Sequence, residues 1–397
     1  MMMKPFLYLS LLLASVVASR AGDEDFPGDY RLLLTPTIPA LTDLETNIYF
    51  DNTYLALNPD NFIVDVIARR GRHQEHRWTY RPTTEPEKQD IGDHVVTLEL
   101  RNQKNEIIGR ASTKVQVRSR EVSADAKPQS LLIMGDSLTN ASVYSGRIAE
   151  LAKEDQLPLR LIGTRGPGAE AQPGGGDGSG NRHEGYGGWT ALRFATKYTG
   201  IARGGEYKQC GSPFLYQDGD ADPKLDFARY CKEFNEGNAP DFVTILLGCN
   251  DTFHGTDETV EERIDVMFEH FETLLTMIHD QDLATKVGAI LPMPPAASQD
   301  AFGENYASSQ TRWQYRRNQH RLLERMVESF GDRDESNVYL VPAWLNLDPV
   351  DGFPSRESKA HAHSETIARR QINGVHPSRE GYRQMGDAIY AWIRSFE

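Results

Sequence analysis

The stretch LLIMGDSLTNAS, residues 131–142, changes from an apolar run to a polar turn within a few positions. Four apolar residues come first, and a glycine, an aspartate and a serine follow them. This order is typical of a strand buried in a parallel sheet and the turn at its carboxyl end. Ser137 is therefore either the cap of a helix or a nucleophile presented at the edge of the sheet.

The chain beyond residue 130 alternates between strand patterns and helix patterns. Such alternation predicts an α/β fold, with a parallel sheet covered by helices on both faces, and ligands bind such sheets beyond the carboxyl ends of the strands. In segment 257–280 apolar residues recur every three or four positions, and Thr259 with Glu262 predicts a capping box at the helix start. The predicted strands are 131–135, 159–164, 241–248, 286–292 and 337–344, and the main predicted helices are 142–154, 257–280, 311–330 and 378–396.

The segment from about residue 25 to 120 has a different pattern, with apolar and polar residues in alternation. The clearest examples are HVVTLELR at 94–101 and RASTKVQVR at 110–118. About seven short runs of this kind predict an antiparallel β-sandwich, Ig-like or jelly-roll in type. We therefore expect a β-sandwich domain over residues 22–120, a polar linker over 121–129 and an α/β domain over 130–397.

The first 21 residues have the pattern of a secretory signal peptide. Lys4 precedes an apolar stretch at 6–17, and the small residues Ser19 and Ala21 come after it. The stretch is short for a bilayer span, although an uncleaved anchor is the alternative. This pattern predicts a secreted or periplasmic protein with no membrane span in the mature chain.

Charge and cysteine content narrow the function classes. The 397 residues carry a net charge of −14, which argues against nucleic acid or an anionic membrane as a partner, because phosphate binding needs basic patches. In an exported protein, Cys210 and Cys231 can form a disulfide across a polar loop, whereas Cys249 is expected in the core. The spacing of the three cysteines matches no zinc motif.

Four short segments at predicted strand ends carry the residue types needed for acyl transfer. They are GDSL at 135–138, EGYGGWT at 184–190, GCND at 248–251 and NGVHPS at 373–378. Ser137 supplies a hydroxyl that becomes a nucleophile once a base such as His376 takes its proton. The backbone N–H groups of Ser137 and Gly188 and the side-chain amide of Asn250 supply donors for an oxyanion.

These four segments, in this order, resemble the SGNH/GDSL hydrolase superfamily of esterases and lipases. The resemblance covers residues 130–397 and places the family's catalytic Ser, Gly, Asn and His on Ser137, Gly188, Asn250 and His376. It implies a flavodoxin-like, three-layer αβα fold and hydrolysis of carboxylic esters. It also implies that no metal and no cofactor is needed.

One position departs from the family pattern. The family usually has Asp three residues before the catalytic His, and this chain has Asn373. An Asn side-chain oxygen can accept from the imidazole Nδ1–H, as in papain-like proteases, but it cannot neutralise an imidazolium. Asp348 or Asp351 is an alternative third member, and a Ser–His dyad assisted by a backbone carbonyl is another.

The expected function is that of a secreted serine esterase acting on short acyl groups, above all acetyl, carried on carbohydrate. No long apolar segment suggests a tunnel for an acyl chain, and an esterase with an added β-sandwich resembles carbohydrate-active architectures. The expected partner is an acylated small molecule or polysaccharide. The alternatives are a lipase or lysophospholipase, and a catalytically weak glycan-binding protein.

Overall fold

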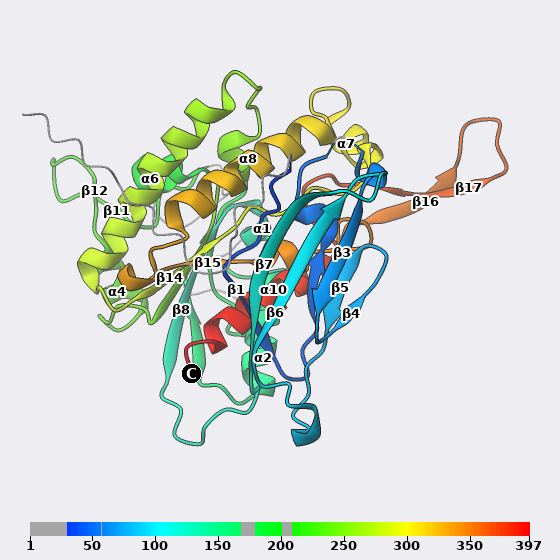
Figure 1. Ribbon diagram of the computed structural model, residues 1–397. Helices are drawn as coiled ribbons and strands as arrows, with labels where there is room; N and C mark the ends of the chain where they lie inside the picture. Colours follow the sequence, from blue (N-terminus) through cyan, green and yellow to red (C-terminus); the bar gives the residue numbers. More distant parts are fainter. Residues whose placement is uncertain (1–29, 57, 168–178, 201–208) are drawn as a thin grey trace, which may run out of the picture.

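The computed structural model of the chain describes residues 30–56, 58–167, 179–200 and 209–397 (Figure 1). It contains N-terminal β-sheets followed by an α/β region. The predicted signal peptide over 1–21 lies outside the described residues. Within the described ranges, no helix has both the length and the apolar character required to cross a membrane.

A parallel sheet forms the centre of the α/β region, as the sequence predicts. Strand β8 pairs with β13 on one side and with β9 and β10 on the other, and β14 and β15 continue the sheet beyond β13. In the register of β8 and β13, Gly135 lies opposite Leu246, so the turns after these two strands meet at one edge. The strands are β8 (Gln129–Gly135), β9 (Leu159–Ile162), β10 (Glu184–Gly185), β13 (Phe242–Leu246), β14 (Lys286–Ile290) and β15 (Val338–Val341).

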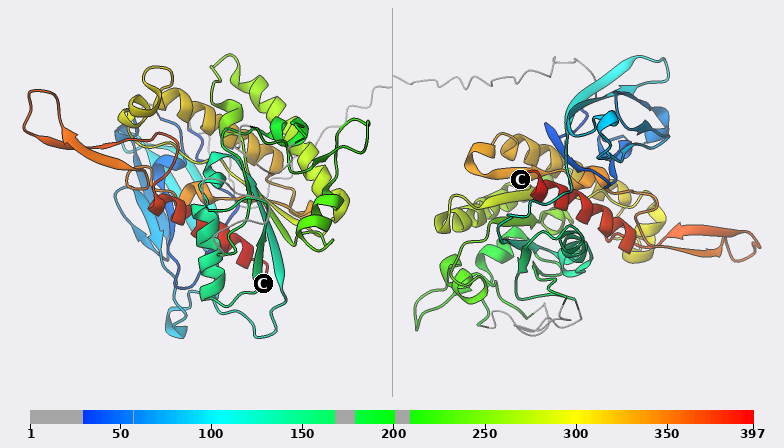
Figure 2. Two further views of the ribbon diagram at one scale, coloured as in Figure 1. Left: turned by 180° about the vertical axis from the view of Figure 1, so that it is seen from behind. Right: turned by 90° about the horizontal axis from the view of Figure 1, so that it is seen from below.

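Helices cover both faces of this sheet (Figures 1 and 2). Helices α6 and α8 lie on one face, and α2 and α10 lie on the other, which confirms the three-layer prediction. The helices are α1 (Ser137–Asn140), α2 (Val143–Glu154), α3 (Ala191–Thr196), α4 (Phe227–Phe234), α5 (Cys249–Thr252), α6 (Val260–Gln281), α7 (Gln299–Tyr306), α8 (Arg312–Phe330), α9 (Ala343–Asn346) and α10 (Arg379–Arg394).

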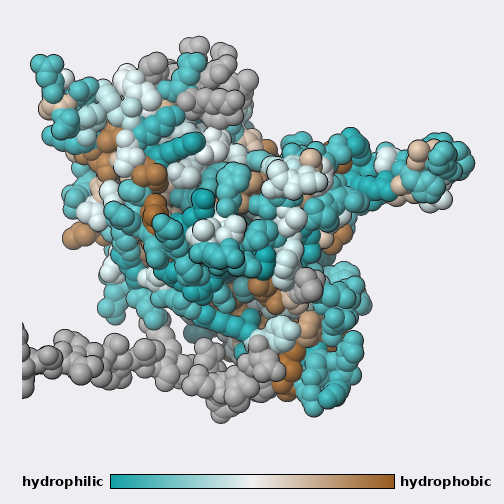
Figure 3. All heavy atoms as spheres, turned by 90° about the horizontal axis from the view of Figure 1, so that it is seen from above, coloured by the Kyte–Doolittle hydropathy of each residue, from teal (hydrophilic) through white to brown (hydrophobic). Residues whose placement is uncertain are grey.

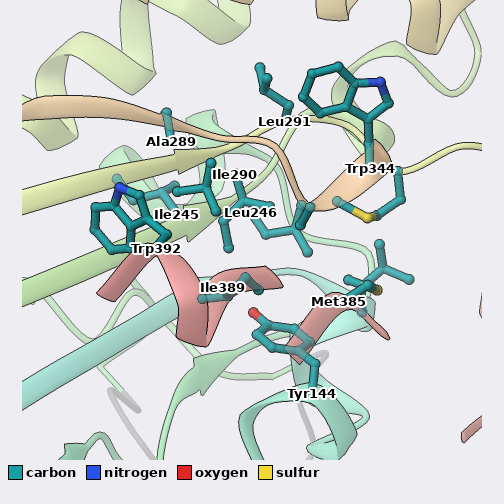
Figure 4. Packing of buried hydrophobic residues seen from close by; sticks show 14 of the residues in the cluster. Tyr144, Ile245, Leu246, Ala289, Ile290, Leu291, Trp344, Met385, Ile389 and Trp392 are labelled. Atoms are coloured by element: carbon teal, nitrogen blue, oxygen red, sulfur yellow. The ribbon is translucent and has the colours of Figure 1, made fainter. Parts of the chain in front are cut away.

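The core between the sheet and the second helix layer is apolar (Figure 4). Strand residues face large side chains from α2 and α10, and all are nearly inaccessible to solvent. Burial of this kind contributes about 25 cal/mol for each Å² of apolar surface and fixes the sheet against the helices. The residues concerned include Leu246 and Ile290 from the strands, and Tyr144, Met385, Ile389 and Trp392 from the helices.

Two helix starts show where sequence signals succeed and fail. The predicted start of the last helix is confirmed, because the Ser378 hydroxyl caps α10 by accepting from Gly381 N at 3.3 Å. The capping box predicted for α6 is wrong. Thr259 occupies the cap position, but its hydroxyl accepts from Thr256 N at 3.0 Å, in the preceding turn.

The N-terminal region contains a four-stranded sheet, in the order β1-β7-β6-β3, and a three-stranded sheet, in the order β2-β5-β4. The predicted antiparallel pairing holds for each of these pairs except one, since β1 runs parallel to β7. The strands are β1 (Thr37–Leu41), β2 (Thr46–Tyr49), β3 (Ile63–Ala68), β4 (Arg72–His73), β5 (Arg77–Tyr80), β6 (Gly92–Arg101) and β7 (Ile107–Arg118).

Buried hydrogen bonds join the N-terminal sheets to the α/β region. The Asn52 amide donates to the carbonyl oxygens of Trp344 at 2.7 Å and Leu347 at 2.8 Å. The Trp344 indole donates back to Asn52 O at 3.0 Å, and Asn47 N donates to Asn346 Oδ1 at 2.7 Å. One hydrophobic cluster includes residues of both regions, so the two regions share a core.

Two features at the surface were not predicted. A hairpin of β16 (Ser355–Lys359) and β17 (Ile367–Gln371) projects from the body of the molecule (Figures 1 and 2), and a second, smaller hairpin joins β11 (Leu215–Tyr216) to β12 (Lys224–Leu225). The face seen from above is mostly hydrophilic, with hydrophobic residues in small patches (Figure 3).

All three cysteines are buried, and the disulfide considered between Cys210 and Cys231 is not formed. Cys249 is buried as predicted, but it lies at the start of α5, not in a strand.

Candidate active site

Ser137 lies just beyond the carboxyl end of β8, as the first residue of α1. The cap of this short helix is Asp136, whose Oδ1 accepts from Leu138 N at 2.9 Å. The interpretation of Ser137 as a helix cap is therefore wrong, and its hydroxyl is available to a base. Gly135 is required before it, because a Cβ there would lie 2.8 Å from the carbonyl oxygen of Leu246.

His376 lies within hydrogen-bond distance of Ser137. Its Nε2 is 2.8 Å from the serine Oγ, although the two residues are far apart in the sequence. This distance suits transfer of the hydroxyl proton to the imidazole. Burial lowers the pKa of His376 below its ordinary value, so the ring is held in the neutral form that can accept a proton.

The backbone around His376 is fixed by neighbouring segments. Asn373 Oδ1 accepts from the backbone N–H groups of Val375 at 3.1 Å and His376 at 2.9 Å. On the other side, Ala296 N donates to Gly374 O at 3.0 Å. The loop after β14 thus supports the histidine loop through Ala296, and α7 contacts the same loop at Gly374.

The three candidates for a third catalytic member have other partners. Asn373 bonds the backbone as described, and Asp348 Oδ1 accepts from the N–H groups of Val350 and Asp351 at 2.8 and 3.0 Å. Asp351 forms an ion pair with an arginine of β17 at 3.0 Å. Among the residues that the structure describes, the only side-chain hydrogen bond of His376 is the one with Ser137. The described geometry is thus a Ser–His pair.

The predicted oxyanion donors converge on the same edge of the sheet. Asn250 lies in α5, and its Nδ2 is 3.2 Å from Asp136 Oδ2 and 3.1 Å from the carbonyl oxygen of Trp189. Gly188 is exposed and has a φ of +72°, a conformation that favours glycine. No acceptor within the described chain binds the backbone N–H of Ser137 or Gly188. Both groups are therefore free to bind an oxyanion.

Two buried carboxyl groups beneath these donors were not predicted. Burial raises the pKa of Asp136 to about 6, and burial together with the charge of Asp136 raises the pKa of Asp251 to about 7. The Cys249 thiol donates to Asp136 Oδ2 at 2.9 Å. Their only sequence signal is that they belong to the GDSL and GCND segments, beside Ser137 and Asn250.

Comparisons with known proteins bear on this geometry. The family profile described as GDSL-like Lipase/Acylhydrolase matches residues 131–389. A comparison with curated proteins gives no match.

Solved structures with similarity include a carbohydrate acetylesterase from Sinorhizobium meliloti, at 17% identity over 68% of this chain and 100% of that one, with a TM-score of 0.34. A putative arylesterase from Agrobacterium tumefaciens str. C58 matches at 16% identity over 68% and 100%, with a TM-score of 0.35. An acetylxylan esterase from Geobacillus stearothermophilus matches at 16% identity over 66% and 93%, with a TM-score of 0.34.

Proposed function

The chain belongs to the GDSL-like lipase/acylhydrolase family and is a carboxylic ester hydrolase, and we propose that its nucleophile is Ser137 and its general base is His376. The observation that carries this proposal is the 2.8 Å distance between Ser137 Oγ and His376 Nε2. The lowered pKa of the buried His376 supports it, because a neutral imidazole is the form that accepts a proton.

The proposed reaction has two halves. Ser137 Oγ attacks the ester carbonyl carbon as its proton passes to His376 Nε2, and the carbonyl oxygen becomes an oxyanion. Ser137 N–H, Gly188 N–H and the Asn250 amide bind this oxyanion, and the amide hydrogen now directed at Asp136 Oδ2 turns to it. The intermediate expels the alcohol, which takes the proton from His376. Water then attacks the acyl-serine with His376 as base, and the acid leaves with Ser137 restored.

We propose Asn373 as a residue that acts through His376 by ordering its backbone. Its side-chain oxygen already accepts two backbone N–H groups, which supports this role. Asp348 and Asp351 are then not needed as members of a triad, since each has partners of its own. A Ser–His pair is sufficient for the chemistry, because the imidazole alone can take and return the proton.

We further propose short acyl esters, above all acetyl, on carbohydrate as the substrate class. Gly188 is exposed, and a Cβ placed there would meet no atom within 4 Å, so this side of the site is open to a bulky molecule. The half-buried rings of Phe253 and Tyr306 lie edge to face at 5.2 Å in a cluster with Val375, next to His376. Such rings offer an apolar surface for a sugar ring. A lipase or lysophospholipase activity is the alternative.

Export is the proposed location, secreted or periplasmic, and it rests on the pattern of residues 1–21 alone.

Hydrolysis of p-nitrophenyl acetate by the full chain tests the proposed chemistry. Ser137→Ala and His376→Ala should each reduce kcat by at least about 10³-fold, and Asn250→Ala should reduce it by about 10²-fold. Equal rates for the wild-type protein and Ser137→Ala would overturn the assignment.

Release of acetate from acetylated xylan, compared with release of fatty acid from lysophosphatidylcholine, tests the substrate class separately. Glycan binding without turnover would favour a binding protein.

A further inference from the structure

Helix α5 holds the segment that follows Gly188 with two successive side chains. Asn250 Nδ2 donates to the carbonyl oxygen of Trp189 at 3.1 Å, and Asp251 Oδ1 accepts from Ala191 N at 3.2 Å. These bonds join the GCND segment directly to the EGYGGWT segment. The Asn250 amide also lies 3.2 Å from Asp136 Oδ2, so all three segments that supply oxyanion donors are linked through α5.

Asp251 is the third residue of α5, and its carboxyl group lies near the backbone N–H of Gly248 at the start of that helix. The Oδ2 of its carboxyl group is buried and has no hydrogen-bond partner in the described part of the chain. Burying an unpaired carboxylate is costly, and burial raises the pKa of Asp251 to about 7. A structural carboxylate would be expected to have both oxygens satisfied.

The segment that Asp251 holds lacks support at Gly188 itself. Among the described residues, nothing lies within 4 Å of the position of a Cβ on Gly188, and the donor to its carbonyl oxygen is the exposed side chain of Arg193 at 2.8 Å. The anchors that follow Gly188 are Trp189, whose N donates to Tyr186 O at 3.2 Å and whose O accepts from Asn250 at 3.1 Å, and the Ala191 N–H bond to Asp251. The direction of the Gly188 N–H depends on these anchors together, and Asp251 supplies the last of them.

We propose that Asp251 is a positioning residue for the oxyanion hole, which fixes the Gly188 N–H by holding the backbone of Ala191. The proposal rests on the oxyanion roles proposed for Gly188 and Asn250. Loss of the hydrogen bond between Ala191 N and Asp251 Oδ1 lets the Gly188 peptide rotate. Because the Gly188 N–H binds the oxyanion, this rotation weakens binding of the transition state more than binding of the substrate.

The test compares kcat and KM for p-nitrophenyl acetate at pH 7 in Asp251→Ala and Asp251→Asn. Asparagine keeps a side-chain oxygen for Ala191 N and resembles the neutral acid. We expect Asp251→Ala to lower kcat by about 10- to 100-fold with KM within about twofold, and Asp251→Asn to keep kcat within about threefold. A merely structural residue would not give this separation. Unchanged kcat in Asp251→Ala, or equal losses in both variants, would overturn the proposal.

Two further variants keep the result interpretable. Ala191→Pro removes the donor from the other side, at a first helical position that tolerates proline after the extended residue Thr190. It should reproduce the loss in kcat, and the double variant with Asp251→Ala should lose no more than either alone; an additive loss contradicts the proposal.

Asp226→Ala, which removes a similar carboxylate cap from α4, should leave kcat unchanged. If Ser137→Ala is as active as wild type, the proposed function has failed instead.

Discussion

The neutral state of His376 sets how the enzyme responds to pH. Burial lowers the pKa of this imidazole from 6.5, and only the neutral ring can take the proton of Ser137. Activity should therefore be lost as pH falls through a midpoint below 6.5, and should be constant from there to about pH 8. The pH dependence of kcat/KM for p-nitrophenyl acetate measures this midpoint. A midpoint above 6.5 would mean that an unrecognised carboxylate supports the ring.

A substitution at Asn373 should shift the midpoint of this pH dependence. Asp at this position keeps the acceptor for Val375 N and His376 N and adds a negative charge near the imidazole. We expect Asn373→Asp to stabilise the imidazolium and raise the midpoint by about one pH unit, with stability little changed. Asn373→Ser, which keeps an oxygen without the charge, is the control and should leave the midpoint in place. An unshifted midpoint in Asn373→Asp would show that the side chain does not act on the ring.

At the residue scale, the sequence predicts the residues whose side chains carry the chemistry, but it does not predict the neighbouring groups that hold them in place. Ser137 and His376 were predicted as partners, and the structure brings them together. Asp251 was missed because its role depends on a backbone N–H sixty residues away, which no local pattern records. The third catalytic member stayed open for the same reason, since the partners of Asn373 are backbone groups of a turn.

At the scale of elements, helix α7 supports the catalytic loop. A Cβ on Gly374 would lie 2.6 Å from the Phe302 ring of α7. Gly374→Ala should therefore displace the loop, lowering stability by about 1 to 3 kcal/mol and reducing kcat. Chemical denaturation and p-nitrophenyl acetate kinetics measure both effects.

The smaller side chain in Phe302→Leu should partly restore Gly374→Ala, because it relieves the contact. Gly303→Ala is the matched control, since a Cβ there meets nothing within 4 Å on the same helix. If Gly374→Ala behaved like this control, α7 would not be holding the loop.

Element prediction succeeded where a repeating pattern spans many residues. The long helices and the parallel strands were found because burial of one face imposes a period on the sequence. The capping box of α6 failed because Thr259 has a competing donor, Thr256 N, in the turn before the helix. The β16–β17 hairpin was missed because its strands face solvent on both sides and show little apolar alternation.

At the scale of the whole molecule, the N-terminal sheets are part of one folded unit. The sequence predicts a β-sandwich domain over 22–120 and a linker over 121–129, and in the structure Asn52 and Trp344 join the N-terminal region to the α/β region by buried hydrogen bonds. Such pairings depend on backbone carbonyls of a distant helix and leave no trace in composition.

We expect Asn52→Ala to destabilise the entire protein. Two buried carbonyl oxygens, those of Trp344 and Leu347, would lose their donor, which costs about 1 to 3 kcal/mol. Calorimetry should show a single transition moved to lower temperature, with Asn61→Ala, at an exposed site, as the control. Two separate transitions, only one of them shifted, would show that the regions fold independently.

The central claim is that Ser137 is a nucleophile activated by His376, and covalent labelling with a fluorophosphonate tests it most directly. Mass spectrometry of the labelled peptides should find the adduct on Ser137, and His376→Ala should abolish the labelling while the protein remains folded. An adduct on another residue, or ester hydrolysis that continues with Ser137 unlabelled, would contradict the account.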